Sequence, residues 1–501
     1  MNILMVYPEC PDTFWSYREA LKFVKKKAST PPLGLLTVAA MLPREWNITL
    51  TDMNVRPLKD SMIQQADYVW MSAMSIQKHS VSEVVRRCTD LGTPIIAGGP
   101  LFSTGWQDFP EIDHIICGEG EVSVAGFLCD LEQGRAGHLY QAGSWAEMTA
   151  SPVPRWDLIR MNDYASMCIQ YSRGCPYACS FCDITLLFGR KIRTKTTQQI
   201  LEELDLIYRM GWRESVFFVD DNFIINKHQL KEDLLPRIIT WMEERNNPFF
   251  FNTQASINIS DDEQLMDLMV RAGFIKIFIG IETPNEASLG ECSKTHNLNR
   301  GLIESVEKIH RSGLEVQGGF IIGFDSDPQT IFDDQISFIQ NSSIVTAMVG
   351  LLSALKGTEL YKRLQRENRL VKEGSGDNTD CSINFLPRMN KDALLAGYKR
   401  VVSTIYSPKY YYSRVRGLLR TYRPSRLKRP AQFRGGRLLA LVKATFLIGI
   451  AGRERWEYWK LLFWTLARRP AALPLAVTFA IYGYHYRKTA DRLKDITPTG
   501  S

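Results

Sequence analysis

Three closely spaced cysteines are the strongest chemical signal in the sequence. Cys175, Cys179 and Cys182 follow the pattern Cys-x3-Cys-x2-Cys. Thiolates are soft ligands that suit iron–sulfur clusters or zinc. A structural zinc site normally needs four ligands, but the next histidine is His228 and the next cysteine is Cys292. Three thiolates on a four-iron cluster would leave one iron open to another ligand.

The cysteine segment resembles the signature of the radical S-adenosylmethionine (SAM) superfamily, Cys-x3-Cys-x-aromatic-Cys, with Phe181 as the aromatic residue. In that superfamily the open iron binds the amino and carboxylate groups of SAM. One-electron reduction then cleaves SAM to methionine and a 5′-deoxyadenosyl radical. The resemblance implies that Cys175, Cys179 and Cys182 bind a 4Fe–4S cluster.

The sequence after residue 166 alternates between apolar strands and helices. Strands are expected at residues 167–171, 216–219, 249–252, 276–280, 315–322 and 344–351, and helices at 197–210, 228–245, 261–272, 298–312 and 329–340. Six such units predict a partial (β/α)6 barrel at residues 166–355, with ligands bound at the carboxyl ends of its strands.

Polar residues at these strand ends match the SAM-binding pattern of the superfamily. For Glu282 a structural salt bridge, and for Arg193 pairing within the protein, remain open alternatives. The resemblance implies that SAM contacts Tyr177, Phe181, Arg193, Asp220, Asp221, Asn222, Gln254, Ser256, Glu282 and Gly319.

The first 135 residues also alternate between short apolar strands and helices, which predicts a doubly wound, Rossmann-like α/β domain. Residues 7–11 lack the spaced glycines of a dinucleotide fingerprint, so NAD binding is not expected. Ligands of such sheets bind beyond the carboxyl ends of the strands, although the glycines there could simply form tight turns. The residues at these ends are Ser72, Met74, Ser75, Gly98, Gly99, Pro100, Gly118, Glu119, Gly120 and Glu121. Residues 136–165 are predicted to be a linker.

A doubly wound domain before a radical SAM barrel resembles the cobalamin (B12)-dependent branch of the superfamily. The resemblance covers residues 1–415 and is closest to the subgroup that includes hopanoid C2-methylases, with matching stretches at 31–36, 218–223 and 280–284. It implies that the strand-end residues of the first domain bind cobalamin. The Asp-x-His-x-x-Gly motif that ligates cobalt in many cobalamin proteins is absent, and the first histidine is His79. Cobalt is therefore expected to have a non-histidine ligand or a lower coordination number.

The resemblance implies a cobalamin-dependent radical SAM methyltransferase. One SAM would methylate cob(I)alamin, and a second would yield the radical that removes hydrogen from an unactivated carbon, which then takes the methyl group. An electron donor such as flavodoxin or ferredoxin is implied. Cyclisation, rearrangement or oxidation without methyl transfer is the first alternative, and a non-catalytic scaffold is the weakest. A tRNA methylthiotransferase would need a second three-cysteine set, but only Cys10, Cys88, Cys117 and Cys129 lie in the first domain.

The C-terminal region differs in charge from the rest of the chain. Residues 401–501 carry 20 Lys and Arg against 4 Asp and Glu, a net charge of +16, which leaves 41 against 50 for residues 1–400. Residues 356–415 are expected to extend the barrel, and residues 416–501 to form basic, aromatic-rich helices. No apolar run there reaches the roughly 18–20 residues that span a bilayer.

Mixed Trp, Leu and Arg instead suit helices lying on an anionic membrane, from which a hydrophobic lipid or isoprenoid-like substrate would be taken. A packed helical subdomain is the alternative, and nucleic-acid binding is not expected.

The composition of the chain is that of a globular protein. Of its 501 residues, 45% are hydrophobic and 23% are charged, and the chain contains 10 cysteines. Such values exclude a disordered chain and a secreted disulfide scaffold. Residues 1–10 lack signal-peptide features, so we expect a cytoplasmic protein, peripheral at the inner membrane surface.

Overall fold

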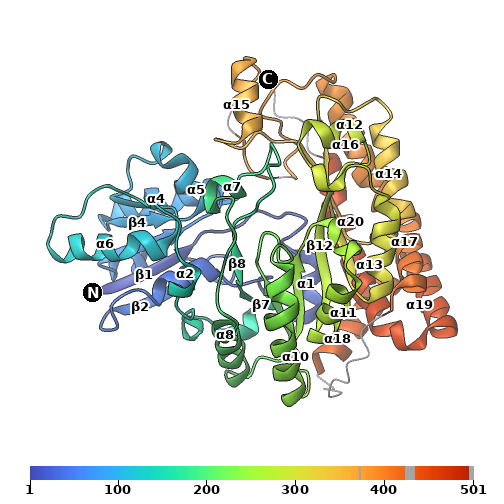
Figure 1. Ribbon diagram of the computed structural model, residues 1–501, viewed down its shortest axis with the longest axis horizontal. Coiled ribbons are helices and arrows are strands. Elements are labelled where there is room, and N and C mark those ends of the chain that lie inside the picture. Colours follow the sequence, from blue (N-terminus) through green and yellow to red (C-terminus); the bar gives the residue numbers. More distant parts are fainter. Residues whose placement is uncertain (372–373, 378, 424–434, 496–501) are drawn as a thin grey trace.

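The computed structural model describes residues 1–371, 374–377, 379–423 and 435–495, and contains two parallel six-stranded sheets. Residues 496–501 and four basic residues of the C-terminal region, Arg426, Lys428, Arg429 and Arg434, lie outside the described residues. In Figure 1 the N-terminal sheet lies on the left, the second sheet in the centre and the C-terminal helices on the right.

The first sheet has the order β2-β1-β3-β4-β5-β6. Its strands are β1 (Asn2–Tyr7), β2 (Asn47–Asp52), β3 (Tyr68–Ser72), β4 (Ile95–Gly98), β5 (His114–Cys117) and β6 (Leu139–Gln141). Alternate residues of β1 enter two separate cores: Ile3 and Met5 pack on one face, and Leu4 and Val6 on the other. Both faces are therefore buried, which explains the nearly unbroken apolar strands.

Helices cover both faces of this sheet. They are α2 (Leu33–Ala39), α3 (Asp60–Gln64), α4 (Lys78–Leu91), α5 (Pro100–Gly105) and α6 (Gly120–Glu132), whereas α1 (Arg18–Val24) packs against helices of the C-terminal region. The strand order reverses between β1 and β3, and the carboxyl side of such a switch point is where doubly wound sheets bind ligands. The predicted linker also contributes to the sheet, because β6 pairs with β5.

The second sheet follows the sequence order from β7 to β14 and remains open. Its strands are β7 (Ser166–Ile169), β10 (Ser215–Phe218), β11 (Phe250–Gln254), β12 (Phe274–Glu282), β13 (Glu315–Ile322) and β14 (Ala347–Leu351). The main helices between them are α8 (Thr197–Arg209), α10 (Leu235–Glu244), α11 (Glu263–Ala272), α12 (Glu286–Glu291), α13 (Leu302–Ser312) and α14 (Ile331–Asn341). The prediction of a doubly wound domain and a partial six-unit barrel is confirmed.

The C-terminal region is helical, as expected. It contains α15 (Glu359–Arg366), α16 (Lys391–Ile405), α17 (Pro408–Thr421), α18 (Gly435–Ala444), the π-helical turn η9 (Thr445–Ile450), α19 (Arg455–Arg468) and α20 (Leu473–Asp495). No helix in these described ranges is long and apolar enough to cross a membrane.

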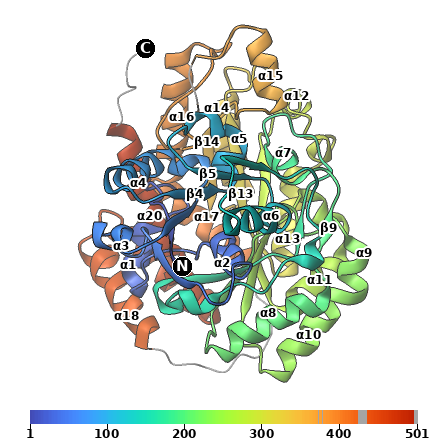
Figure 2. The same ribbon diagram turned by 90° about the vertical axis from the view of Figure 1, so that its left-hand side faces the viewer.

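Residues 14–17, near the N-terminus, pack together with α20 against the barrel. His485 of α20 lies 3.2 Å from the carbonyl oxygen of Phe14, and the Tyr486 hydroxyl donates to the Tyr17 hydroxyl at 3.0 Å. Trp15 in turn packs edge-on against Phe278 of β12. Residues 14–17 therefore lie between α20 and the barrel, and Figures 1 and 2 both show α20 beside the N-terminal segment.

Candidate active site

Backbone hydrogen bonds hold the three-cysteine loop at the carboxyl end of β7. Gly174 has φ +96°, and a Cβ there would lie 2.5 Å from the Lys191 carbonyl oxygen, so the loop needs glycine at this position. The Cys175 amide donates to the Gly189 carbonyl at 3.2 Å, and the Cys182 amide donates to the Cys179 carbonyl at 3.1 Å. The main chain thus shapes the loop without using the thiols.

All three thiols are reduced and half-buried. Burial raises the pKa of each, that of Cys182 to about 12, while the nearby Lys294 cation acts in the opposite direction. Within the described ranges, no three His, Cys, Asp or Glu side chains are arranged to hold a single metal ion. Three soft thiols on one loop beside a buried cation are a donor set that fits an iron–sulfur cluster.

Lys294 is a site residue that the sequence did not reveal. Its Nζ lies 2.6 Å from Glu282 Oε1, and the two side chains are only 12% and 8% exposed. Burial disfavours the charged lysine, but the Glu282 carboxylate and the neighbouring Cys179 raise its pKa above the ordinary value. The cation is therefore held permanently beside the cysteines.

Glu282 reaches Lys294 because the end of β12 is distorted. The register with β13 shifts between Gly280 and Glu282, and Glu282 has φ +64°, which is rare for a residue with a side chain. A Cβ at Gly280 would collide with both Glu282 Oε1 and Lys294 Nζ. The salt bridge that was the open alternative for Glu282 is thus present in the structure.

The adjacent aspartates Asp220 and Asp221 have different surroundings. Asp220 is fully buried and accepts hydrogen bonds from the Tyr171 amide at 3.1 Å and the Ser172 hydroxyl at 2.6 Å, so it fixes the start of the cysteine loop. The Oδ2 atom of Asp221 is buried and has no hydrogen-bond partner among the described residues. Burial, followed by repulsion from Asp220 and Asp183, raises the pKa of Asp221 to about 7. Asp221 therefore supplies an unpaired acceptor at the end of β10.

A hydrogen-bond chain joins the ends of β10 and β11 to the cysteine loop. The Asn222 amide nitrogen donates to Ser256 Oγ at 3.1 Å, and Ser256 Oγ donates to Asn258 Oδ1 at 2.7 Å. The Asn258 amide nitrogen donates to the Tyr177 hydroxyl at 3.2 Å, and the Tyr177 ring stacks on His296 at 3.9 Å. Burial lowers the pKa of His296 to about 3, so this imidazole is neutral at physiological pH.

The other predicted SAM residues lie at the same end of the barrel. Gln254 ends β11, and the Phe181 ring lies 6.3 Å from the Phe324 ring. Gly319 of β13 faces an aromatic ring, since a Cβ there would lie 2.6 Å from Phe278 Cζ. Packing alone thus accounts for the glycine at 319.

Arg193 pairs within the protein. Its Nη1 lies 2.7 Å from Glu119 Oε2 and donates to the Ala146 carbonyl at 2.6 Å, while Nη2 donates to the Phe188 carbonyl at 2.7 Å. Arg173 bonds to Glu119 at 2.9 Å and to Glu121 at 2.8 Å. Glu119 and Glu121, predicted at the cobalamin site, thus form a buried ion-pair network with two arginines of the barrel domain.

The remaining predicted cobalamin residues gather at the carboxyl edge of β3, β4 and β5. Gly99 has φ +93°, and a Cβ there would lie 2.6 Å from Ser72 Oγ, so this glycine allows the β3 and β4 ends to approach closely. Pro100 begins α5 and Gly120 begins α6, while the Gly118 amide donates to Ser103 Oγ at 2.9 Å. Met74 and Ser75 follow β3 on the same edge, with Met74 43% exposed.

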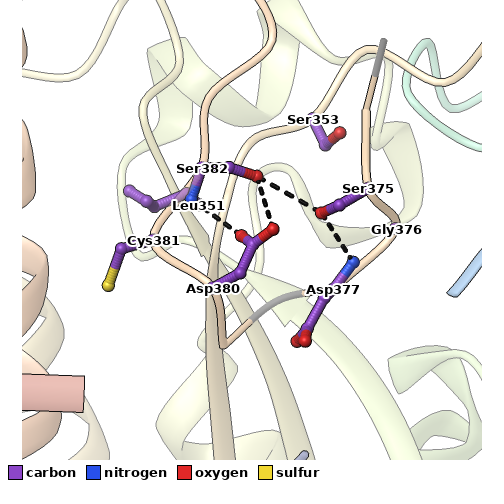
Figure 3. A pocket seen from close by; sticks show the side chains of 8 residues that line it. All are labelled: Leu351, Ser353, Ser375, Gly376, Asp377, Asp380, Cys381 and Ser382. Carbon is purple, nitrogen blue, oxygen red and sulfur yellow. Dashed lines mark hydrogen bonds between the residues drawn. The ribbon is translucent and has the colours of Figure 1, made fainter. Parts of the chain in front are cut away.

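A loop from the C-terminal region covers part of this edge. A Cβ on Gly376 would lie 3.1 Å from the Ile76 amide, so the loop contacts the turn after β3. Figure 3 shows that the Asp380 carboxylate accepts hydrogen bonds from both the amide and the hydroxyl of Ser382, and that the Asp377 amide donates to Ser375 Oγ. These residues line a cavity of about 10 Å³ with Leu351 and Ser353 at the end of β14. Such a cavity holds about one water molecule and no substrate.

Three segments match known protein families. Residues 23–128 match the B12 binding domain, residues 169–333 the radical SAM superfamily, and residues 358–497 a domain of unknown function, DUF4070. The first two matches cover the doubly wound domain and the barrel.

Two relatives match almost the whole chain. An uncharacterized methyltransferase of Synechocystis sp. is 39% identical over 494 residues, which cover 97% of this chain and 91% of that protein. The hopanoid C-2 methylase of Rhodopseudomonas palustris is 34% identical over 478 residues, which cover 93% and 90%.

Two solved structures share the fold. The radical SAM methyltransferase TsrM of Kitasatospora setae, with cobalamin and a 4Fe–4S cluster bound, has a TM-score of 0.61 at 14% identity and covers 98% of this chain and 99% of its own. The cobalamin-dependent radical enzyme OxsB, with aqua-cobalamin and SAM bound, also has a TM-score of 0.61 at 14% identity and covers 99% and 80%.

Proposed function

This chain belongs to the cobalamin-dependent radical SAM methyltransferase family, and from that premise we propose that it adds a methyl group to an unactivated carbon of a hydrophobic, lipid or isoprenoid-like small molecule. The observation that carries the proposal is the match to the hopanoid C-2 methylase over 93% of the chain, which includes the helical C-terminal region. Its cofactors are a 4Fe–4S cluster, SAM and cobalamin.

We propose that Cys175, Cys179 and Cys182 hold the cluster. When bound, the cluster and SAM supply a 5′-deoxyadenosyl radical and cobalamin supplies the methyl group. Lys294 offsets the negative charge of the thiolates, and Glu282 keeps this lysine in place. Such outer partners orient and tune metal ligands.

SAM would bind at the carboxyl end of the barrel. The unpaired Asp221 Oδ2 suits an ammonium group, and the chain from Asn222 to Tyr177 fixes the polar groups around it. Because a fully bonded network loses little entropy when a ligand binds, these side chains are preorganised. Gln254, Ser256 and Phe181 complete the proposed SAM contacts, while Arg193 acts through the domain interface.

Cobalamin would bind at the carboxyl edge of the first sheet, where Ser72, Met74, Ser75 and the turns at Gly98 and Gly118 come together. The buried Arg173 and Arg193 pairs fix this edge relative to the barrel. The role of the chain is therefore to hold two cofactor sites in one orientation around a substrate.

The proposal is tested by assaying reconstituted protein with reductant, SAM and cobalamin, together with lipid mass spectrometry of cells with and without the gene. We expect S-adenosylhomocysteine, 5′-deoxyadenosine and a product heavier by one CH2. Deoxyadenosine without a methylated product would overturn the proposal and favour cyclisation, rearrangement or oxidation. A flavodoxin or ferredoxin is the proposed electron donor.

A further inference from the structure

An exposed apolar row runs along the helix formed by α18 and η9. Leu438, Val442, Phe446 and Ile450 follow one another at every fourth residue and are 52%, 57%, 59% and 57% exposed. On the opposite side of the same helix, Ala440, Ala444 and Ile448 are buried. The helix therefore packs against the protein through its buried side, and the apolar row lies on the side that faces outward.

The neighbouring helix α19 extends this apolar surface. Trp456 and Phe463 are 70% and 64% exposed, while Tyr458 on the inner side of α19 is buried. The Trp459 Nε1–H donates to the Gly449 carbonyl of η9 at 2.9 Å, and its ring stacks on Phe463. The two helices therefore present their exposed side chains on adjoining surfaces.

We call this surface the C-terminal apolar surface. It carries nine of the eighteen large hydrophobic side chains that are exposed in the described chain, a concentration that monomeric proteins rarely show without a binding role. Its members are Leu438, Leu441, Val442, Phe446, Leu447, Ile450, Trp456, Phe463 and Leu466.

Cations surround the C-terminal apolar surface, and its acids are already neutralised. Arg453, Arg455, Lys460 and Arg468 are exposed on or next to α19. Glu454 is buried against Arg487 at 2.8 Å, and Glu457 pairs with Arg416 at 3.2 Å and with Lys460 at 2.9 Å. The outward field of this region is therefore positive.

A basic pocket lies at the end of α19. It measures about 390 Å³ and is lined by Arg420, Trp464, Arg468 and Arg469. The Arg420 guanidinium lies 5.6 Å from the centre of the Trp464 ring, and Arg469 is held by the Tyr422 carbonyl at 3.0 Å. Two positioned guanidinium groups beside an indole suit the phosphate of a lipid headgroup next to the acyl region.

We propose that the C-terminal apolar surface docks the protein on an anionic bilayer, with α18, η9 and α19 lying at the headgroup level. Outward Leu, Phe and Trp side chains would enter the acyl boundary, and the flanking cations would contact anionic headgroups. A protein partner would match the apolar row but gives no reason for the uncompensated cations. This proposal is independent of the methyl-transfer chemistry.

The experiment is flotation of the full-length, reconstituted protein with vesicles. One set contains only phosphatidylcholine, and the other contains equal parts of phosphatidylcholine and phosphatidylglycerol. We expect binding to the anionic set at low salt and weaker binding at 1 M salt, where the screening length falls to about 3 Å. Absence of binding to anionic vesicles at low salt would overturn the proposal.

Variants separate the apolar and electrostatic contributions. Phe446→Ser combined with Phe463→Ser, and Arg453→Glu combined with Arg468→Glu, should each lower the partition coefficient by about tenfold or more. The matched controls are Met210→Ser for an exposed apolar side chain and Lys59→Glu with Arg44→Glu for exposed cations, which should bind like the wild type. Wild-type binding by both docking variants would contradict the proposal.

Two further measurements identify other occupants. Each variant is first checked by circular dichroism, because exposed substitutions should leave the melting temperature unchanged.

The oligomeric state in solution is measured as well. If the protein is a dimer that Phe446→Ser combined with Phe463→Ser dissociates, and it does not bind vesicles, the surface is assigned to a second copy of the chain and the proposal is overturned. Binding of an oligonucleotide in preference to anionic vesicles would overturn it in favour of nucleic acid.

Discussion

Lys294 Nζ lies 2.6 Å from Glu282 Oε1 at the carboxyl end of the barrel, and both charges are enclosed by protein. The pair is close enough to the cysteine loop for Lys294 to lower the pKa of Cys175, Cys179 and Cys182 against the effect of burial. A buried ion pair costs desolvation energy in the folded protein. Its position beside the proposed cluster indicates that it serves the site rather than the stability of the fold.

Replacing one partner of this pair should destabilise the protein. Lys294→Met leaves the Glu282 carboxylate buried without a cation, which costs about 3–5 kcal/mol. The measurement is urea unfolding of the reconstituted protein. Lys294→Met combined with Glu282→Gln should recover most of the loss, because no unpaired charge remains. If the Lys294→Met variant unfolds at the same urea concentration as the wild type, the stability of the fold does not depend on this ion pair.

The three cysteines should be required for the cluster, whereas Cys292 should not. Alanine at Cys175, Cys179 or Cys182 removes a thiolate that solvent cannot replace with similar affinity. We expect loss of bound iron and of SAM cleavage. Cys292 is buried near Cys179 but lies outside the loop, so Cys292→Ala is the matched control. Iron content and reductive SAM cleavage test both, and wild-type cleavage in any of the first three would refute the assignment.

Gly174→Ala should disturb the cluster site while every cysteine is kept. The added Cβ would lie 2.5 Å from the Lys191 carbonyl, and φ +96° is unfavourable for alanine. We expect a lower iron content after reconstitution. Gly126→Ala is the control, since nothing lies within 4 Å of its added Cβ. Equal iron content in both variants would mean that the loop adapts to the substitution.

Arg193 should act at the domain interface. Arg193→Met leaves Glu119 with Arg173 and the Ala146 amide as partners and removes the donor from two carbonyls, so we expect a loss of about 2–4 kcal/mol. Arg190→Met, at an exposed nearby arginine, should cost less than about 1 kcal/mol. Urea unfolding and equilibrium SAM binding are measured together. Normal stability with a large loss of SAM affinity would instead support direct contact of Arg193 with SAM.

His310 should make the protein sensitive to acid. It is 1% exposed in α13, neither ring nitrogen has a hydrogen-bond partner in the described part of the chain, and burial lowers its pKa to about 3. Because the folded pKa lies below the unfolded value, the stability is full above about pH 6.5 and falls as the unfolded state takes up a proton, by about 2 kcal/mol at pH 5.

His310→Leu should remove this contribution. The free energy of unfolding is measured from pH 7.5 to pH 5. We expect it to fall less steeply in the variant than in the wild type, because the variant has no imidazole to take up a proton on unfolding. Parallel pH profiles would show that folding does not lower the pKa of His310.

Local patterns were sufficient to predict the architecture. Strand β13 has the expected bounds, 315–322, and six of its eight residues are buried. The cysteine motif is equally local. The match to the radical SAM superfamily confirms the expected barrel. The individual contacts to SAM and cobalamin stay predictions.

Long-range pairings could not be read from local patterns. Glu119 was predicted at the cobalamin site and Arg193 at the SAM site. Their 2.7 Å contact depends on how the two domains pack, which no local pattern reveals. Lys294 lies in a stretch without hydrophobic periodicity, and only the distorted end of β12 brings Glu282 to it. The C-terminal region was expected to lie on a membrane surface, with a packed helical subdomain as the alternative. In the structure α20 packs inside, while α18 and α19 keep exposed apolar side chains.

The contact between residues 14–17 and α20 has a consequence for biosynthesis. Tyr17 meets Tyr486 across 469 residues of sequence. At a translation rate of about 5–20 residues per second, residues 14–17 wait roughly 25–95 seconds for α20 to emerge from the ribosome. The sides of Phe14 and Tyr17 that α20 contacts stay uncovered for that time, although the doubly wound domain can fold earlier. A shortened C-terminus would make this transient exposure permanent, so loss of α20 should appear first as aggregation of newly made protein.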